Sequence, residues 1–340
     1  MAAEATGNVF EVDDFVLLSG RVLPRARIVF ETHGTLSAGR DNAILFPTWF
    51  TSLPSSNRWL IGPGRALDSS RWFIICPGLL GNGASSSPSN APAPHAGAAF
   101  PAIATLDNVR LQRRLLQECL GVDSLALVMG RSMGAQTAWQ WAVSYPEQVQ
   151  RMFALCGSAK TTAHNYVFLD SLKAALQSDG RFRDGYYTEP PVDGLRAIGR
   201  AYAAWALSAE FYRQNLHMRQ GASDIEDYIA RFWANNFLRC DANDLLCMLD
   251  TWQRADVSSD PVTGSDWHKA LQRATARSIV MPSRTDMYFP PEDSANAVAC
   301  MPRAELRVLD SVWGHRAGSA GSDPRDITQI DRAIRDLLQE

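Results

Sequence analysis

The sequence predicts an α/β protein in which a mostly parallel, doubly wound sheet is interrupted by an inserted helical cap. Short, continuous apolar runs at 43–46, 72–76 and 124–129 are typical of strands buried on both faces. Strand and helix patterns alternate from residue 106 to residue 156, which indicates parallel strands joined by helices. Helical patterns then dominate up to about residue 272, after which the alternation resumes.

This change of pattern predicts a division of the 340 residues into three segments. Residues 1–159 and 273–340 are expected to form the two parts of the α/β core, and residues 160–272 the cap. Because open α/β sheets bind ligands beyond the carboxyl ends of their strands, we expect the cap to lie over that edge.

The individual elements are predicted from apolar periodicity and from turn residues. A Gly-, Ser- and Pro-rich stretch at 78–101 indicates a long loop, and Tyr145-Pro146 ends a helix. The expected strands are 14–19, 26–33, 43–46, 72–76, 124–129, 149–156, 277–282 and 304–309. The expected helices are 106–119, 133–144, 195–214, 224–237 and 325–338.

Charge and composition narrow the possible partners. The formal net charge is -3, from 33 basic and 36 acidic residues, so we expect no nucleic-acid partner. No apolar run is long enough to span a bilayer, and the acidic start lacks the features of a secretory signal, so a cytoplasmic protein is expected. The six cysteines have no zinc-site spacing and are interpreted as buried, reduced side chains; no metal or cofactor is expected.

The segment Gly130-Arg131-Ser132-Met133-Gly134 fits the pattern G-x-S-x-G between a predicted strand and a predicted helix. This context is typical of a nucleophile elbow, in which two glycines allow a tight turn that exposes the serine hydroxyl. Ser132 is therefore the candidate nucleophile. The alternative interpretation is an ordinary strand-to-helix turn.

A serine hydroxyl needs a base, and elbows of this kind are followed along the chain by an acid and then a histidine. Of six histidines, only His315 follows the last predicted strand. Asp286 is the acid close behind strand 277–282, with Glu292 and Asp293 as alternatives. The competing interpretations are a surface histidine and a turn aspartate.

Acyl transfer also needs N–H groups directed at the developing oxyanion. We expect one from Met133, the residue after the nucleophile, and one from Phe50, with Trp49 as the next candidate. The two aromatic rings are also expected to restrict the acyl pocket, although simple core packing would explain them too.

Several motifs, in one order, extend over most of the chain. They are Phe30-Glu31-Thr32-His33-Gly34-Thr35-Leu36, Asp41-Asn42-Ala43-Ile44-Leu45, Pro63-Gly64-Arg65-Ala66-Leu67-Asp68, Arg71-Trp72-Phe73-Ile74-Ile75-Cys76-Pro77, Phe100-Pro101, Asp107-Asn108-Val109-Arg110, Ser132-Met133-Gly134-Ala135-Gln136, Trp141-Ala142, Tyr145-Pro146-Glu147 and Asp241-Ala242-Asn243. With them the sequence resembles the homoserine O-acetyltransferase family of α/β-hydrolases, and its esterase branch more than a true transacetylase. The resemblance implies the triad Ser132, Asp286 and His315, a helical cap and a homodimer.

Departures from the family pattern concern the acceptor site. Family transferases usually carry Asp directly after the histidine, where it helps to hold the amino group of homoserine; Arg316 stands there and would repel an ammonium group. Arg131 and Ala135 replace two elbow glycines. Trp205-Ala206-Leu207-Ser208 replaces Thr-Tyr-Arg-Ser, and Pro47-Thr48-Trp49-Phe50 replaces His-Ala-Leu-Thr.

The favoured hypothesis is therefore a serine carboxylesterase that hydrolyses short-chain acyl esters, above all acetates, with Trp49 and Arg316 in its substrate pocket. The alternative is an acyl-CoA-dependent O-acetyltransferase with an alcohol acceptor. A third hypothesis, from another class, is an inactive hydrolase fold that serves as a binding module; the complete triad and elbow argue against it.

Overall fold

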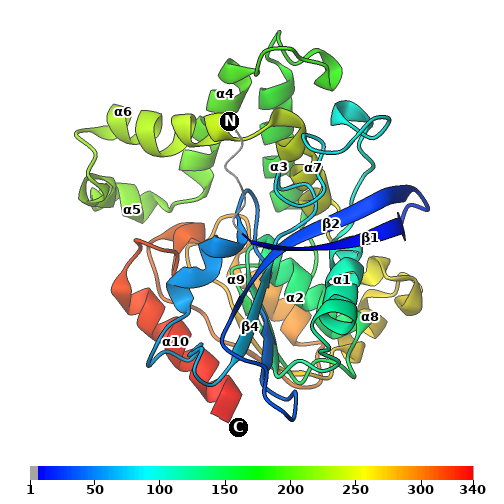
Figure 1. Ribbon diagram of the computed structural model, residues 1–340. Helices are drawn as coiled ribbons and strands as arrows, with labels where there is room; N and C mark the ends of the chain where they lie inside the picture. The colour runs from blue at the N-terminus through cyan, green and yellow to red at the C-terminus, as the bar shows by residue number, and fades with distance from the viewer. Residues whose placement is uncertain (1–6, 340) are drawn as a thin grey trace.

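An eight-stranded sheet forms the centre of the computed structural model, which describes residues 7–339 (Figure 1). The strand order is β1-β2-β4-β3-β5-β6-β7-β8. Strands β4 to β8 and β3 run parallel, whereas β2 is antiparallel to both β1 and β4. The strands are β1 (Asn8–Val16), β2 (Val22–His33), β3 (Ala43–Leu45), β4 (Phe73–Pro77), β5 (Leu127–Arg131), β6 (Arg151–Leu155), β7 (Arg277–Met281) and β8 (Ala304–Leu306).

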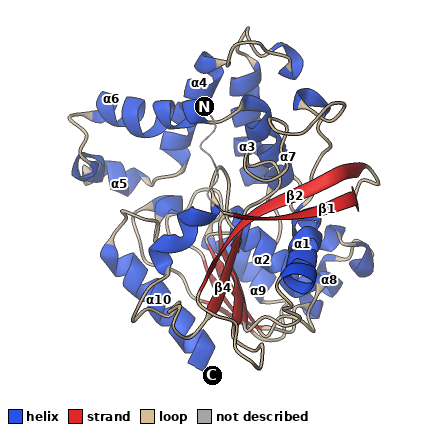
Figure 2. Ribbon diagram, in the orientation of Figure 1, coloured by secondary structure: helices blue, strands red, loops and turns tan. Residues whose placement is uncertain are grey.

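Helices cover both faces of the sheet (Figure 2). They are α1 (Thr105–Arg114), α2 (Met133–Ser144), α8 (Trp267–Arg273), α9 (Pro291–Val298) and α10 (Pro324–Gln339). Because successive side chains of a strand point to opposite faces, Leu45 packs in the cluster that contains α1, α2 and α8, and Ile44 in the cluster that contains α10. This double burial explains the continuous apolar strand sequences and confirms the predicted fold class.

Five further helices are inserted between β6 and β7 and lie above the sheet in Figure 1. They are α3 (Ala163–Gln177), α4 (Val192–Trp205), α5 (Ala209–Arg213), α6 (Ile225–Tyr228) and α7 (Ala242–Gln253). Their apolar side chains join the same buried cluster as the α10 face of the sheet. The helix α8 begins within 160–272 and ends one residue beyond it, and it packs against α2 of the core.

Some predicted boundaries are wrong. The first strand is β1 at 8–16 rather than 14–19, because its hairpin with β2 extends the pairing towards the N-terminus. The predicted helix 195–214 is broken between α4 and α5, where Ser208 caps α5 by accepting a hydrogen bond from the Phe211 N–H at 3.0 Å. The end of the predicted helix 106–119 widens into a π-helical turn at Leu115–Cys119.

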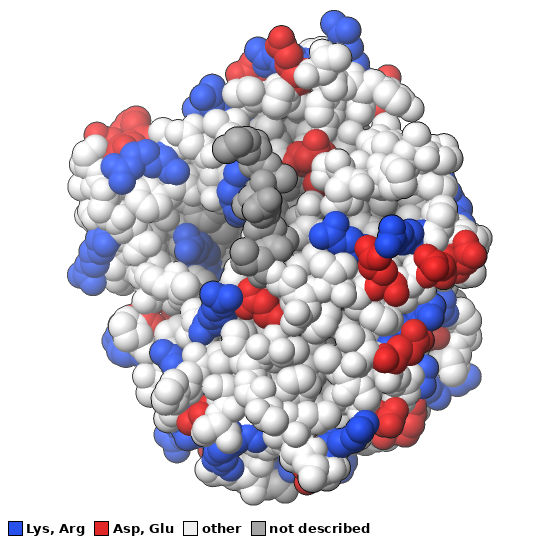
Figure 3. Space-filling model, in the orientation of Figure 1, with Lys and Arg blue, Asp and Glu red and all other residues white. Residues whose placement is uncertain are grey.

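The surface carries both signs of charge on the face shown in Figure 3. No helix within residues 7–339 is long and apolar enough to cross a membrane. The first six residues, on which the expectation about a secretory signal rests, lie outside the described part of the chain. The six cysteines are unpaired; Cys76 and Cys156 are buried, but Cys119 is exposed, so the expectation of uniformly buried thiols is wrong.

Candidate active site

Ser132 lies in a strained turn between the end of β5 and the start of α2. Its φ and ψ are 56° and -127°, a region that favours glycine. Two glycines make the turn possible, because a Cβ at Gly130 would lie 2.0 Å from the Gly134 carbonyl oxygen and one at Gly134 would lie 2.7 Å from the Pro47 oxygen. The Ser132 N–H donates to the Leu155 carbonyl at 3.0 Å, which ties the elbow to β6.

His315 follows β8 in a short helical turn that docks against the break between α4 and α5. The Arg316 N–H donates to the Ala206 carbonyl at 3.3 Å, and the Ser208 hydroxyl donates to the Val312 carbonyl at 2.5 Å. At Gly314, where φ is 57°, a Cβ would lie 2.9 Å from the Ala206 oxygen. The break between α4 and α5, which the sequence pattern did not predict, therefore holds the loop that carries His315.

Asp286 lies in the loop after β7, which is joined to the histidine loop. The Thr285 hydroxyl accepts a hydrogen bond from the Gly314 N–H at 3.0 Å and donates to the Ser311 carbonyl at 2.8 Å. One oxygen of the Asp286 carboxylate, Oδ1, accepts the N–H groups of Tyr288 and Phe289 at 3.1 Å each. These bonds fix the carboxylate and leave Oδ2 free for another donor.

These three loops bring Ser132, His315 and Asp286 into one hydrogen-bonded chain. His315 Nε2 lies 2.9 Å from Ser132 Oγ, and His315 Nδ1 lies 2.7 Å from Asp286 Oδ2. All three residues are at most 5% exposed. The alternative acids, Glu292 and Asp293, lie in the first turn of α9, and neither hydrogen bonds to His315.

The surroundings of His315 favour its neutral form. Burial lowers the pKa of the imidazole, while the carboxylate of Asp286 opposes that shift and the charges of Arg131 and Arg316 add to it. A neutral imidazole whose Nδ1–H donates to Asp286 presents Nε2 as an acceptor to the serine hydroxyl. The arrangement can therefore remove the serine proton and return it to a leaving group.

The two residues predicted to supply oxyanion donors, Met133 and Phe50, lie at the start of α2 and in the loop after β3. Met133 is the first residue of α2, where a helix N–H has no intrahelical acceptor. Within the described residues, the Phe50 N–H also has no acceptor. The Phe50 ring is buried and stacks on Tyr202 at 5.9 Å between ring centroids.

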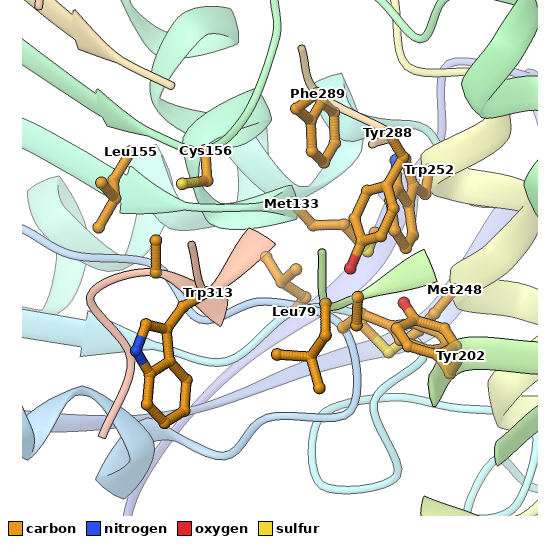
Figure 4. Packing of buried hydrophobic residues seen from close by; sticks show 14 of the residues in the cluster. Leu79, Met133, Leu155, Cys156, Tyr202, Met248, Trp252, Tyr288, Phe289 and Trp313 are labelled. Carbon is orange, nitrogen blue, oxygen red and sulfur yellow. The ribbon is translucent and has the colours of Figure 1, made fainter. Parts of the chain in front are cut away.

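An aromatic cluster adjoins the histidine, and sequence reasoning missed it. The Tyr288 ring lies 4.2 Å from the His315 ring, and Trp252 lies 5.5 Å from Tyr288, between ring centroids. Figure 4 shows that Met133 points towards these rings and that the hydroxyls of Tyr202 and Tyr288 point towards one another. The only signal in the sequence was the position of Tyr288, two residues after Asp286.

Two arginines flank the same histidine. Arg131, 5% exposed, donates from its guanidinium to the His315 carbonyl and lies 5.6 Å from the centre of the Trp49 ring. Arg316 lies 5.9 Å from the centre of the Trp233 ring. Trp49 and Arg316, the two residues predicted to line the pocket, therefore each take part in a cation–π contact. Trp49 contacts Arg131, and Arg316 contacts Trp233.

A cavity of about 780 Å³ lies away from this chain of hydrogen bonds. It is bordered by residues of the segment between β4 and α1, among them Ser89 and Ala98, and by the segment from Arg181 to Glu189 between α3 and α4. None of its lining residues belongs to the Ser132 site. Within residues 7–339, no group of three or more His, Cys, Asp or Glu side chains is arranged to hold a metal ion.

Known proteins resemble this chain in both sequence and fold. Residues 44–317 match the family model described as alpha/beta hydrolase fold. An ethyl acetate hydrolase from Pseudomonas veronii is 37% identical over 334 residues, which cover 97% of this chain and 95% of that protein. The crystal structure of an acetylester hydrolase from Corynebacterium glutamicum has a TM-score of 0.95 and 35% identity, covering 99% of this chain and 97% of that one.

Transferases are also among the relatives. A homoserine O-acetyltransferase from Trichormus variabilis is 32% identical over 319 residues, which cover 89% of this chain and 87% of that protein. The resemblance to the homoserine O-acetyltransferase family, on its esterase side, is thereby confirmed. The chain belongs to the α/β-hydrolase fold family.

Proposed function

We propose that this protein is a serine carboxylesterase that hydrolyses short-chain acyl esters, above all acetates, through an acyl-enzyme on Ser132. The observation that carries the proposal is the continuous chain from Ser132 Oγ through His315 to Asp286, with contacts of 2.9 and 2.7 Å. The names of the esterase relatives support acetate esters as the substrate class.

In the first half of the reaction, His315 Nε2 takes the proton of the Ser132 hydroxyl as Oγ attacks the ester carbonyl carbon. The N–H groups of Met133 and Phe50 stabilise the oxyanion, and Asp286 stabilises the imidazolium. His315 then returns the proton to the departing alcohol oxygen as the carbon–oxygen bond to the alcohol breaks. In the second half, His315 activates water, which releases the acid and regenerates Ser132.

Acyl transfer to an amino-acid alcohol is disfavoured by the charge beside His315. The ammonium group of an amino acid needs a carboxylate partner, whereas Arg316 and Arg131 place positive charge beside His315 and Asp286 is already bonded to His315. Two like charges in a partly buried site repel each other. Water carries no charge and is not opposed in this way.

A paired assay tests the proposal. One arm measures hydrolysis of ethyl acetate, ethyl butyrate and ethyl octanoate by the purified protein and by Ser132→Ala. The other arm measures free thiol released from acetyl-CoA with and without L-homoserine. We expect acetate hydrolysis that falls with chain length, a loss of ~10⁴-fold or more in Ser132→Ala, and no homoserine-dependent thiol release. Homoserine-dependent release, or an active Ser132→Ala, would overturn the proposal.

We further propose that α3 to α7 form the cap expected for residues 160–272, and that the protein acts as a homodimer in the cytoplasm. The family resemblance supports the dimer. The unpaired cysteines suit a reducing compartment. Sedimentation equilibrium of the purified chain tests the dimer, since a monomer across the micromolar range would contradict it.

A further inference from the structure

Arg316 is a partly buried cation that has no anionic partner among the residues that the structure describes. Its backbone is fixed, since its N–H donates to the carbonyls of Ala206 and Trp313 at 3.3 and 3.0 Å. Its guanidinium lies 5.9 Å from the centre of the Trp233 ring. Within residues 7–339, no carboxylate pairs with this guanidinium, and burial lowers its pKa from the usual value.

Some arginines of the chain lie beside acids, and Arg316 differs from them. Arg58 with Glu31 and Arg307 with Asp336 are two ion pairs of this kind, at 2.9 and 2.6 Å. Removing a charge from water without a charged partner is unfavourable. The Trp233 ring offsets only part of this cost, because a cation–π contact is weaker than an ion pair in a buried site.

The charged groups around His315 also favour the binding of an anion. The positive charges of Arg131 and Arg316 both lower the pKa of the His315 imidazole. Among the groups that shift this pKa, Asp286 is the one carboxylate, and it raises the pKa. Both oxygens of Asp286 are already used, by His315 and by the N–H groups of Tyr288 and Phe289. Arg131 Nε and Trp233 Nε1 are buried and have no acceptor among the described residues. The site therefore has an excess of positive charge and of unused donors.

The position of Arg316 indicates that this excess positive charge lies beside the alcohol portion of the substrate. In acyl transfer by a serine, the histidine delivers a proton to the departing alcohol oxygen, so the alcohol portion lies beside the imidazole. Arg316 is the next residue in the chain and faces the cap at Trp233 and Tyr228. The buried aromatic cluster of Tyr202, Tyr288 and Trp252 adjoins both Met133 and His315, and its rings suit an uncharged acyl group.

We infer that Arg316 forms an anion subsite, and that the preferred substrates are acetate esters whose alcohol portion carries a carboxylate. The inference rests on the proposed esterase function and specifies its substrate class. The guanidinium binds the carboxylate by charge-assisted hydrogen bonds while His315 acts on the ester oxygen. The surface in Figure 3 is hollowed between the α5–α6 side of the cap and the core, with basic side chains at the back of the hollow.

Two pairs of isosteric esters test the inference. The first pair, 3-acetoxypropanoate and 3-acetoxypropanamide, places a carboxylate or a neutral amide on the alcohol portion. The second pair, monoethyl succinate and ethyl succinamate, places the same groups on the acyl portion. For each pair the readout is the ratio of kcat/KM for the anionic ester to kcat/KM for the neutral ester, in the wild type and in variants with unchanged circular dichroism.

We expect the wild-type ratio for the first pair to be ~10 or more, as a charge-assisted hydrogen bond would give. Arg316→Met should bring it to within about 2-fold of one, and Arg316→Lys should retain part of the preference. The control Arg213→Met removes an exposed arginine of α5 that pairs with Glu210, and should leave the ratio at the wild-type value.

Three outcomes would overturn the inference. They are a wild-type ratio near one for the first pair, an equal ratio in Arg316→Met, and an Arg316-dependent preference confined to the succinate pair, which would place the anion on the acyl portion. A failure of the proposed function looks different, since the wild type would then hydrolyse neither neutral ester, or would do so without Ser132.

Discussion

His315 Nε2 and Ser132 Oγ lie 2.9 Å apart although 183 residues separate them in the sequence. The contact exists because β5 and the loops after β7 and β8 end at the same edge of a parallel sheet. The cap contributes as well, since Ala206 and Ser208 hold the loop that carries His315. The core and the inserted helices thus both position this pair.

The Asp286 carboxylate should matter through orientation and charge. Asp286→Asn keeps the size of the side chain, but the N–H groups of Tyr288 and Phe289 hold its one oxygen, so an NH2 donor faces His315 Nδ1 and no longer selects the Nδ1–H form. We expect kcat for ethyl acetate to fall by ~10³- to 10⁴-fold, with the thermal midpoint changed far less. The control Asp310→Asn removes an exposed carboxylate that pairs with Arg284, and should leave kcat unaffected. An equal loss in both variants would contradict the assignment.

The pH dependence should report on His315. Only the neutral imidazole can accept the serine proton, so activity is present above the pKa of His315 and is lost as the pH falls through it. Because burial lowers that pKa, we expect the acid limb of kcat/KM to have its midpoint below the usual 6.5. Arg316→Met removes a charge that lowers the pKa, so its midpoint should move upwards. A downward movement would be inconsistent with this electrostatic account.

The elbow glycines should be required for folding as well as for activity. A Cβ at Gly130 would lie 2.0 Å from the Gly134 oxygen and 2.5 Å from the Ala135 nitrogen, both backbone atoms. We expect Gly130→Ala to lower the free energy of unfolding by about 3 kcal/mol or to prevent folding. At Gly180 a Cβ would meet nothing within 4 Å, so Gly180→Ala should stay within about 1 kcal/mol of the wild type in urea.

A buried acid in the cap should make stability depend on pH. Burial raises the pKa of Asp244 from 3.8 to about 7, while hydrogen bonds from the N–H and hydroxyl of Ser89 oppose the rise. Because the folded state binds this proton more tightly than the unfolded state, the contribution of Asp244 to stability is greatest below 3.8 and declines as the pH rises to about 7.

Asp244→Asn keeps hydrogen-bonding groups beside Ser89 but cannot ionise. The decrease in thermal midpoint between about pH 5 and about pH 8 should therefore be smaller in this variant than in the wild type. Asp266→Asn, at the start of α8, is the control and should keep the wild-type difference. If Asp244→Asn kept it too, the burial of a titrating carboxyl at this position would be refuted.

Sequence patterns predicted those parts of the molecule that depend on local spacing and chain order. The helix 133–144 matches α2 at both ends, and the three side chains predicted from the elbow motif, the following acid and the final histidine lie in one hydrogen-bonded chain. Amphipathic periodicity continued through residues 206–208, so it could not show that these residues leave the helix to bind the His315 loop.

Such patterns could not predict contacts between segments that lie far apart in the sequence. Nothing local to Tyr288 indicates that its ring packs on His315, and nothing local to Arg316 indicates that no carboxylate within residues 7–339 pairs with it. Both facts depend on which side chains the fold brings together from the sheet and the cap. The substrate preference inferred from Arg316 therefore required the three-dimensional arrangement.

In the proposed reaction Ser132 carries the acyl group during ester hydrolysis. Rapid acid quenching of the wild type during turnover of p-nitrophenyl acetate, followed by peptide mass spectrometry, would detect that group. We expect one acetyl group on the peptide that contains Ser132, absent from Ser132→Ala treated in parallel. Continued turnover with no acetyl group on Ser132, or with the acetyl group on another residue, would contradict the proposed reaction.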